Sequence, residues 1–385
     1  MEKVIKKPDM SFMIVTRDFW PQTAAIGDTL LRLAKELSFC GETSVVTMSN
    51  QAISSLANKM DNRLSRINFC VAKPLSTSKT NLLLRLFEIF YFMAFVLFYL
   101  LLKKPDKVYV STNPPIFIPF VIALYCKLFN KKLYYHVQDI HPEATKIILK
   151  IPNFLFFLLK RLDTWTINNS EAIITLTEDM KGTIINRGCK SKVLLVENPC
   201  RTVDVDRGNF INGIIFSGNA GRLQEMEVLL TSIEQYLDCG GNLPFTFLGG
   251  GIHSRKILEM SKKYPNFKYL GYLNGDMALK ITNEHKWGLV PIKGDALKYA
   301  YPSKIASYLS AGCNLLCVTD IDSNLALWVK NKKIGIVVEP EVSQLINAYK
   351  RIELDYEMVV PSKEGLFIKI DVAAKRLFNI INSRS

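Results

Sequence analysis

Two segments in the second half of the chain have the residue types that bind phosphate. The string Ser-Gly-Asn-Ala-Gly-Arg at 217–222 follows a short apolar run and precedes an amphipathic stretch, which predicts a turn between a strand and a helix. Its residues Gly218, Asn219 and Gly221 let backbone N–H groups approach an anion, and Arg222 can bind phosphate through two nitrogens. The alternative is an ordinary glycine-rich turn without a ligand.

The second segment begins Tyr-Pro-Ser-Lys at 301–304 and leads into an apolar helix that ends at a glycine. Lys304 is expected near the N-terminus of this helix, where the helix dipole disfavours a positive charge. An anion bound there would remove the conflict, so we interpret Lys304, with Pro302 and Ser303, as part of a diphosphate site. A solvated lysine on the first turn is the alternative.

Further turns of this kind occur at 249–251, which are three glycines, and at Gly271 and Tyr272. Both follow apolar runs that predict strands, and ligands of parallel sheets bind beyond the carboxyl ends of strands. The backbone around Gly250 can hydrogen-bond a planar base, and the ring of Tyr272 can stack on one. Plain turn glycines are the alternative.

Titratable groups gather in the first half, in the string His-Val-Gln-Asp-Ile-His-Pro-Glu at 136–143. Asp139 is expected just beyond a strand, where its carboxylate can orient a hydroxyl group or accept its proton. The other candidates in this string are Gln138, His136, His141 and Glu143. The alternatives are an N-cap role for Asp139 and hydrogen-bonded structural positions for the histidines.

Short apolar strands alternate with helices along the chain, which predicts parallel sheets covered on both faces. The expected strands lie at 12–15, 43–48, 107–111, 132–137, 172–176 and 193–196, and then at 213–217, 245–248, 267–270, 288–291, 314–318 and 335–338. A polar stretch without periodicity at 199–210 predicts a linker. We therefore expect two Rossmann-like, doubly wound α/β domains facing a cleft, at 1–198 and 211–365. The last helix, at 366–385, is expected to pack back on the first domain.

The composition excludes several classes of protein. The 385 residues are 49% hydrophobic and 22% charged, unlike a disordered chain or a coiled-coil rod. The net charge of +14 is uneven, because residues 1–200 hold 26 basic and 16 acidic residues, and this excess suits phosphate-bearing ligands or anionic lipid. No nucleic-acid partner is expected, since the bases form no recognised module with aromatic residues. Eight cysteines without a CxxC pair argue against zinc and disulfides and favour the cytoplasm.

One apolar stretch raises the question of a membrane. Residues 82–102 are apolar except for Arg85 and Glu88, and two lysines follow. A spanning helix needs about 20 apolar residues, and two charges in the first turns would be costly at the centre of a bilayer. Shorter apolar stretches with basic flanks lie at 116–129 and 153–161. Core helix, peripheral membrane contact and membrane span all stay open, and we expect a peripheral protein on the inner face of the cytoplasmic membrane.

Six motifs in a fixed order resemble those of the bacterial retaining glycosyltransferases of family 4, over about residues 12–350. They are Phe19–Pro21 near Gly27, Ser111–Pro115, Val137–Glu143, Ser217–Arg222, Gly249–Gly251 and Tyr301–Gly312. The resemblance is closest to the branch that builds O-antigen, capsule and exopolysaccharide repeat units. It implies a GT-B fold, a nucleotide-sugar donor, here expected to be a UDP-sugar, no obligatory metal and no further cofactor. It also implies an acceptor that is often lipid-linked, as on polyprenyl diphosphate.

The resemblance assigns roles to the residues introduced above. Asp139, Gln138 and His136 are the catalytic candidates. The donor-binding candidates are Gly27, Gly218, Asn219, Gly221, Arg222, Gly250, Tyr272, Pro302, Ser303, Lys304 and Ser307. Many family members have two glutamates eight residues apart where this chain has Tyr299 and Ser307, so the ribose contact is expected to pass to Ser307 or to the backbone.

Two other functions fit the same fold. A sugar-nucleotide epimerase would need several acids and histidines for proton transfer, and the chain has four histidines and no acid at 299 or 307. A catalytically inactive partner protein would bind nucleotide without turnover.

Overall fold

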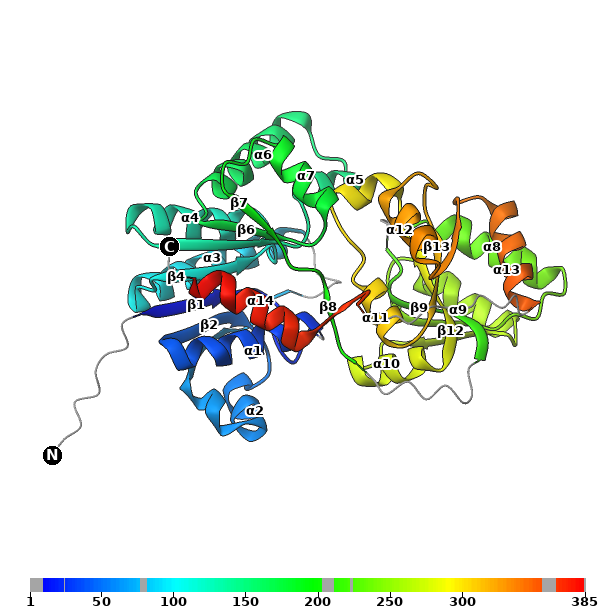
Figure 1. The fold of residues 1–385 in the computed structure, drawn as a ribbon, viewed down its shortest axis with the longest axis horizontal. Helices are drawn as coiled ribbons and strands as arrows, with labels where there is room; N and C mark the ends of the chain where they lie inside the picture. Colours follow the sequence, from blue (N-terminus) through cyan, green and yellow to red (C-terminus); the bar gives the residue numbers. More distant parts are fainter. Residues whose placement is uncertain are drawn as a thin grey trace. The chain divides into compact units, whose positions relative to one another are not determined.

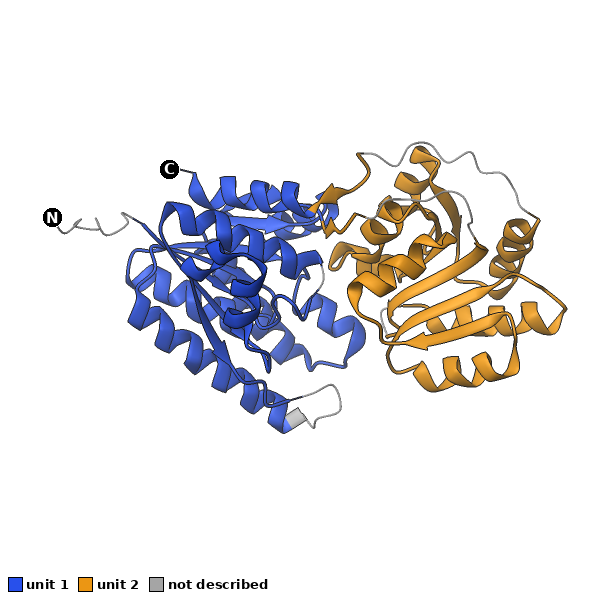
Figure 2. Cartoon of the chain, turned by 90° about the horizontal axis from the view of Figure 1, so that it is seen from below, with its two compact units in different colours: residues 1–197, 370–385 blue, residues 198–369 orange. Residues whose placement is uncertain are grey.

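The computed structural model describes residues 10–23, 25–76, 82–202, 211–221, 224–354 and 365–383. The chain divides into two compact units, of which unit 1 is Met1–Glu197 with Ile370–Ser385 and unit 2 is Asn198–Lys369 (Figure 2). Each unit is a parallel sheet with helices between its strands, which confirms the expected class of two doubly wound α/β domains.

Unit 1 is built on a seven-stranded sheet in the order β3-β2-β1-β4-β5-β6-β7. Its strands are β1 (Ser11–Val15), β2 (Glu42–Met48), β3 (Ile67–Ala72), β4 (Lys107–Ser111), β5 (Lys132–Val137), β6 (Ala172–Thr175) and β7 (Lys192–Leu195). Every pair is parallel, so all carboxyl ends lie at one edge of the sheet. The sequence analysis missed β3, whose outer residues are partly polar because it is an edge strand.

The helices of unit 1 can be followed in Figure 1. They are α1 (Ala25–Cys40), α2 (Ile53–Met60), α3 (Leu82–Lys103), α4 (Phe117–Leu128), α5 (Glu143–Ile148), α6 (Asn153–Asn168), α7 (Glu178–Asn186) and α14 (Ile370–Asn382), with a 3₁₀ turn at Asn62–Arg66. Helix α1 packs against α14, and α4 packs against both α3 and α6. Buried Lys107 donates to the carbonyl oxygens of Ile381 at 2.6 Å and Ser383 at 3.3 Å, which satisfies the C-terminus of α14.

Unit 2 repeats the strand order with six strands, β11-β10-β9-β12-β13-β14. They are β9 (Ile211–Asn219), β10 (Phe245–Gly250), β11 (Phe267–Gly271), β12 (His285–Pro291), β13 (Asn314–Val318) and β14 (Gly335–Val338). The short strands β8 (Pro199–Cys200) and β15 (Ile368–Lys369) pair with each other, so the segment expected as a linker begins in an ordered strand. Residues 203–210 of that segment lie outside the described residues.

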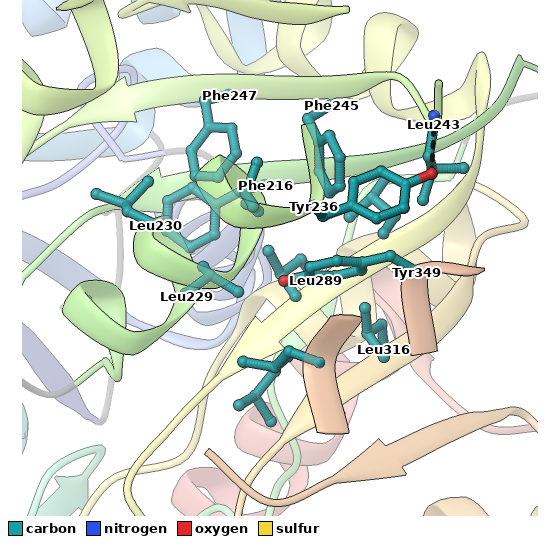
Figure 3. Packing of buried hydrophobic residues seen from close by; sticks show 14 of the residues in the cluster. Phe216, Leu229, Leu230, Tyr236, Leu243, Phe245, Phe247, Leu289, Leu316 and Tyr349 are labelled. Atoms are coloured by element: carbon teal, nitrogen blue, oxygen red, sulfur yellow. Dashed lines mark hydrogen bonds between the residues drawn. The ribbon is translucent and has the colours of Figure 1, made fainter. Parts of the chain in front are cut away.

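Helices cover the sheet of unit 2 and close an aromatic core. The helices are α8 (Met226–Asp238), α9 (Ser254–Lys263), α10 (Gly275–Asn283), α11 (Lys304–Ser310), α12 (Asn324–Lys332) and α13 (Val342–Glu353), with a 3₁₀ turn at Gly294–Lys298. Figure 3 shows Phe216 of β9 beside Phe247 of β10, and the two rings stack with centroids 5.2 Å apart. This core holds the middle of β9 rigidly, and β9 leads into the candidate site.

Candidate functional site

The carboxyl end of β9 is the point in unit 2 where the strand order reverses. Strand β10 lies on one side of β9 and β12 on the other, so the connections from β9 and β12 leave toward opposite faces of the sheet. In open α/β sheets such a switch point leaves a crevice beyond the strand ends, where ligands bind. Gly218, Asn219 and Gly250 all lie at this end of the sheet.

Two glycines allow the ends of β9 and β10 to come close together. Gly218 has a φ of +132° and Gly249 a φ of +100°, which L side chains rarely adopt. A β-carbon on Gly249 would lie 2.2 Å from the carbonyl oxygen of Gly218. The two positions therefore require glycine, and the result is bare backbone at the end of the sheet.

The side chain of Asn219 lies over the neighbouring glycine turns. A β-carbon on Gly251 would lie 2.6 Å from Asn219 Oδ1, and one on Gly221 would lie 3.0 Å from Asn219 Nδ2. The structure thus brings Asn219, Gly221 and Gly251 together beside Gly218. Arg222, the expected partner of a phosphate, lies outside the described residues.

Lys304 is the first residue of α11, and its ammonium group reaches this glycine turn. A β-carbon on Gly218 would lie 3.6 Å from Lys304 Nζ, which also sits 3.9 Å from the centroid of the Phe216 ring. Nζ is buried and has no hydrogen-bond partner among the described residues. Burial lowers the pKa of Lys304 to about 7, because the charged form loses its hydration.

Tyr308 fixes the position of α11 against β9. Its hydroxyl oxygen accepts a hydrogen bond of 2.8 Å from the backbone N–H of Ser217, next to Gly218. The ring occupies the space beside Gly288, where a β-carbon would lie 2.4 Å from Tyr308 Cγ. Lys304 lies one turn before Tyr308 on the same face of the helix, so this contact holds the ammonium group at the turn.

The other donor-binding candidates of unit 2 surround this centre. The ring of Tyr272 is 81% exposed and lies against the backbone of Gly250, where a β-carbon would come within 2.5 Å of Tyr272 Cε2. Pro302 and Ser303 immediately precede Lys304, and Ser307 follows it by three positions, on a neighbouring part of the helix face. The structure therefore gathers most of the predicted donor residues at one end of one sheet.

In unit 1, the candidate acid Asp139 lies just beyond β5. Thr112 follows β4, and its hydroxyl oxygen accepts hydrogen bonds from the backbone N–H groups of Gln138 at 3.2 Å and Asp139 at 3.3 Å. Burial raises the pKa of Asp139 to about 6. A carboxyl group with this pKa can exchange a proton near neutral pH, as a general acid or base must.

The structure buries His136 inside unit 1 and packs Gly27 against the turn before α1. The ring of His136 is buried inside unit 1. Its Nδ1 lies 2.6 Å from the hydroxyl of Tyr109, and its Nε2 has no hydrogen-bond partner among the described residues. Burial lowers the pKa of His136 to about 4. A β-carbon on Gly27 would lie 2.6 Å from Thr23 Oγ1, so the turn before α1 fills the space beside this glycine.

His141 and Glu143 belong to a buried network rather than to an open site. Arg187 Nη2 donates to the carbonyl oxygen of His141 at 2.6 Å and contacts Glu143, and Arg187 Nη1 contacts Asp163. Lys160 Nζ lies 3.2 Å from the second oxygen of Glu143. These contacts satisfy the acids structurally, and within the described ranges no three His, Cys, Asp or Glu side chains form a cluster that suits a metal ion.

Sequence reasoning missed four residues that position these groups. They are Phe216, Gly288 and Tyr308 around Lys304, and Thr112 beneath Asp139. Tyr308 and Thr112 lie inside motifs that the sequence analysis singled out, so their hydroxyl groups were available as a signal. Gly288 carried no such signal, because its partner Tyr308 is 20 residues away in the sequence.

Comparison with known proteins gives the fold a name. No family model and no curated protein matches the sequence. HepE of Anabaena, solved in complex with UDP, matches with a TM-score of 0.61 and 13% identity over 97% of this chain and 95% of that chain. Sucrose-phosphate synthase of Thermosynechococcus elongatus matches with a TM-score of 0.69 and 11% identity over 96% and 98%.

A further match is a Listeria monocytogenes protein assigned as a UDP-N-acetylglucosamine 2-epimerase, with a TM-score of 0.62 and 12% identity over 97% and 96% of the two chains. At such low identity these likenesses show the fold alone. The two doubly wound units of this chain have the GT-B fold.

Proposed function

We propose that this protein is a family 4 glycosyltransferase that moves a sugar from a UDP-sugar to a lipid-linked or growing polysaccharide acceptor, in the synthesis of O-antigen or capsule. The single observation that carries the proposal is the ammonium group of Lys304. It is buried at the switch point of a nucleotide-binding type of sheet, and it has no partner in the described part of the chain. A buried cation without a partner is costly, and a bound diphosphate would supply the missing anion.

The residues of unit 2 have distinct tasks in this proposal. The bare backbone at Gly218 and Gly249 lets the diphosphate approach, and Lys304 stabilises the negative charge that grows on the leaving nucleotide. The exposed ring of Tyr272 stacks on the base, and Ser307 contacts the ribose. The donor needs no metal in this scheme, because the charge is balanced by Lys304 and the backbone.

The residues of unit 1 bind and orient the acceptor in this proposal. Asp139 orients the acceptor hydroxyl group, held in place through Thr112. The hydroxyl then attacks the same face of the sugar that the nucleotide leaves, and the leaving phosphate takes the proton, so the configuration is retained. A lipid-linked acceptor, such as a saccharide on polyprenyl diphosphate, suits the basic charge of this half.

The test is calorimetric titration with UDP, GDP, ADP, CMP and uridine, with and without Mg²⁺. Lys304→Met should weaken UDP binding by about 10- to 150-fold, the loss of one charge-assisted contact, and leave uridine binding unchanged. Lys298→Met is the matched control, since Lys298 lies nearby in sequence but its side chain is 63% exposed. It should bind UDP like the wild type.

Several outcomes would contradict the proposal. Equal UDP affinity in Lys304→Met and wild type would remove Lys304 from the diphosphate site. UDP binding without sugar transfer to any lipid-linked acceptor would favour the inactive partner protein. Conversion of a UDP-sugar to its epimer without transfer would favour the epimerase.

A further inference from the structure

Helix α3 has a buried stripe that fastens it to unit 1. Among Leu83–Lys103, the buried side chains are Glu88, Phe92, Val96 and Leu100, which recur every fourth residue and so share one face. Helix α3 packs through this region against α4, β2 and β3. The protein therefore covers one side of the helix over three turns.

The one acid of α3 takes part in this attachment. Glu88 Oε1 accepts from Arg17 Nη2 at 2.7 Å, and Glu88 Oε2 accepts from the backbone N–H groups of Leu75 and Ser76 at 2.6 Å each. Arg17 lies two residues after β1, so the first half of α3 lies at the carboxyl edge of the sheet. This is the edge that also carries Asp139.

The opposite face of α3 is exposed and wholly apolar. Its exposed side chains include Leu83, Leu86, Phe87, Phe90, Leu97, Phe98 and Leu101, and Phe87, Phe90 and Phe98 are 57–59% exposed. A helix on the surface of a water-soluble protein normally has polar residues on this side. Contiguous exposed apolar surface of this kind marks a site of interaction.

Neighbouring helices add to this apolar surface. Helix α4 lies against both α3 and α6. Leu124 and Leu128 of α4 are exposed, as are Phe154, Phe157 and Leu158 of α6. We call the exposed apolar residues of α3, α4 and α6 the apolar face of unit 1.

The charges around the apolar face are almost all positive. Residues 82–104, 113–131 and 144–162 hold nine Lys and Arg and a single acid, Glu88, which is buried. Three of these bases, Lys103, Lys131 and Lys160, pair with acids outside these ranges. Lys104, Lys127, Lys150 and Arg161 are exposed. A second copy of the chain would bring like charges together, whereas the surface of an anionic bilayer complements both the apolar residues and the bases.

We propose that the apolar face of unit 1 lies on an anionic lipid bilayer, with α3 in the plane of the membrane. Helix α3 is the one helix among the described residues that is long and apolar enough to cross a bilayer. Its buried stripe and its ion pair with Arg17 argue instead for a helix that stays packed on unit 1 and exposes one face to lipid. This inference is independent of the nucleotide site, although it brings the Asp139 edge close to a membrane-borne acceptor.

The experiment is flotation of the purified full-length protein with phosphatidylcholine vesicles that contain phosphatidylglycerol, and with pure phosphatidylcholine vesicles. The wild type should float with the anionic vesicles and much less with the neutral ones, and high salt should reduce binding. The triple variant Phe87→Ser, Phe90→Ser, Phe98→Ser should lower the bound fraction by about tenfold or more. The matched control replaces Ile252, Leu258 and Leu327 of unit 2, which are similarly exposed, by Ser and should float like the wild type.

Four results would overturn the proposal. The first is a wild type that floats with neither kind of vesicle. The second is a triple variant whose bound fraction equals that of the wild type. A dimer in solution that the triple variant abolishes would assign the face to a second copy. Resistance to extraction with alkaline carbonate would show a spanning helix. UDP binding measured on the same variants separates these results from a failure of the proposed function, and circular dichroism reports that the variants are folded.

Discussion

Arg187 in unit 1 and Lys304 in unit 2 both have buried charged groups, and they differ in what surrounds those groups. Arg187 in unit 1 contacts the carboxylates of Glu143 and Asp163 and donates to the carbonyl oxygen of His141. Lys304 in unit 2 faces the ring of Phe216 and glycine backbone, with no hydrogen-bond partner in the ranges that the structure describes. Burial of a charge is costly unless it is paired, so the first cation is explained by the fold and the second is not.

We interpret this contrast as one between a structural cation and the binding cation of the proposed function. The partners of Arg187 come from α5 and α6 and from the loop before α5, so it joins elements of the unit. The ammonium group of Lys304 contacts the ring of Phe216 but has no hydrogen-bond partner among the described residues, and burial lowers its pKa to about 7. A site that binds an anion has to keep such a charge ready before the ligand arrives.

The largest expected effect comes from breaking the paired cation. Arg187→Met leaves Asp163 buried without a cation and Glu143 with Lys160 alone, so the free energy of unfolding of unit 1 should fall by about 3–5 kcal/mol. Native-state hydrogen exchange resolved by peptide would show faster exchange in unit 1 and little change in unit 2. Lys181→Met, on the helix α7 that ends just before Arg187, is the control, because its ion pair with Glu178 is exposed and should contribute less than about 1 kcal/mol. Equal losses of unfolding free energy in Arg187→Met and Lys181→Met would contradict the distinction between a buried, paired cation and an exposed one.

Replacing the unpaired cation should raise the free energy of unfolding instead of lowering it. Lys304→Met keeps most of the side-chain volume and removes the buried charge, so unit 2 without nucleotide should gain between about 1 and 4 kcal/mol. The native pKa of about 7 lies below the ordinary 10.5, so the unfolded state binds more protons between these values and wild-type stability rises there. The stability that Lys304→Met gains over the wild type should therefore be full below pH 7 and shrink toward pH 10.5. A loss of stability at pH 6, measured by hydrogen exchange, would show that Lys304 has a structural partner.

The smallest expected effect sharpens how Lys304 is held. Tyr308→Phe removes the acceptor for the N–H of Ser217, and both the stability of unit 2 and UDP affinity should fall by on the order of 1 kcal/mol. Tyr349→Phe is the control, because the Tyr349 hydroxyl pairs with Ser232 Oγ at 3.0 Å elsewhere in the same unit. It should lower stability to a similar degree and leave UDP affinity unchanged in calorimetry. An equal loss of affinity in both variants would contradict the positioning role of Tyr308.

Most of the fold was predictable because its signals are local. Short apolar strands that alternate with helices identified twelve of the strands, and the turn residues after them identified the ends that carry Gly218, Gly250 and Asp139. Strand β3 was not predicted, since an edge strand is only partly buried and its apolar pattern is weak. The ion pair of Glu88 in an apolar helix could not be predicted from the sequence either, because its partner Arg17 lies 71 residues earlier.

Taken alone, the sequence determined which residues stand at the ends of strands, because hydrophobic periodicity and turn glycines act over a few neighbouring positions. Only the tertiary structure decided which of these residues have partners. It buried His136 against Tyr109 and left Lys304 beside Gly218, held there through Tyr308 and Gly288. The physical reason is that pairing and desolvation of a charge depend on neighbours in space, and those neighbours come from distant parts of the chain.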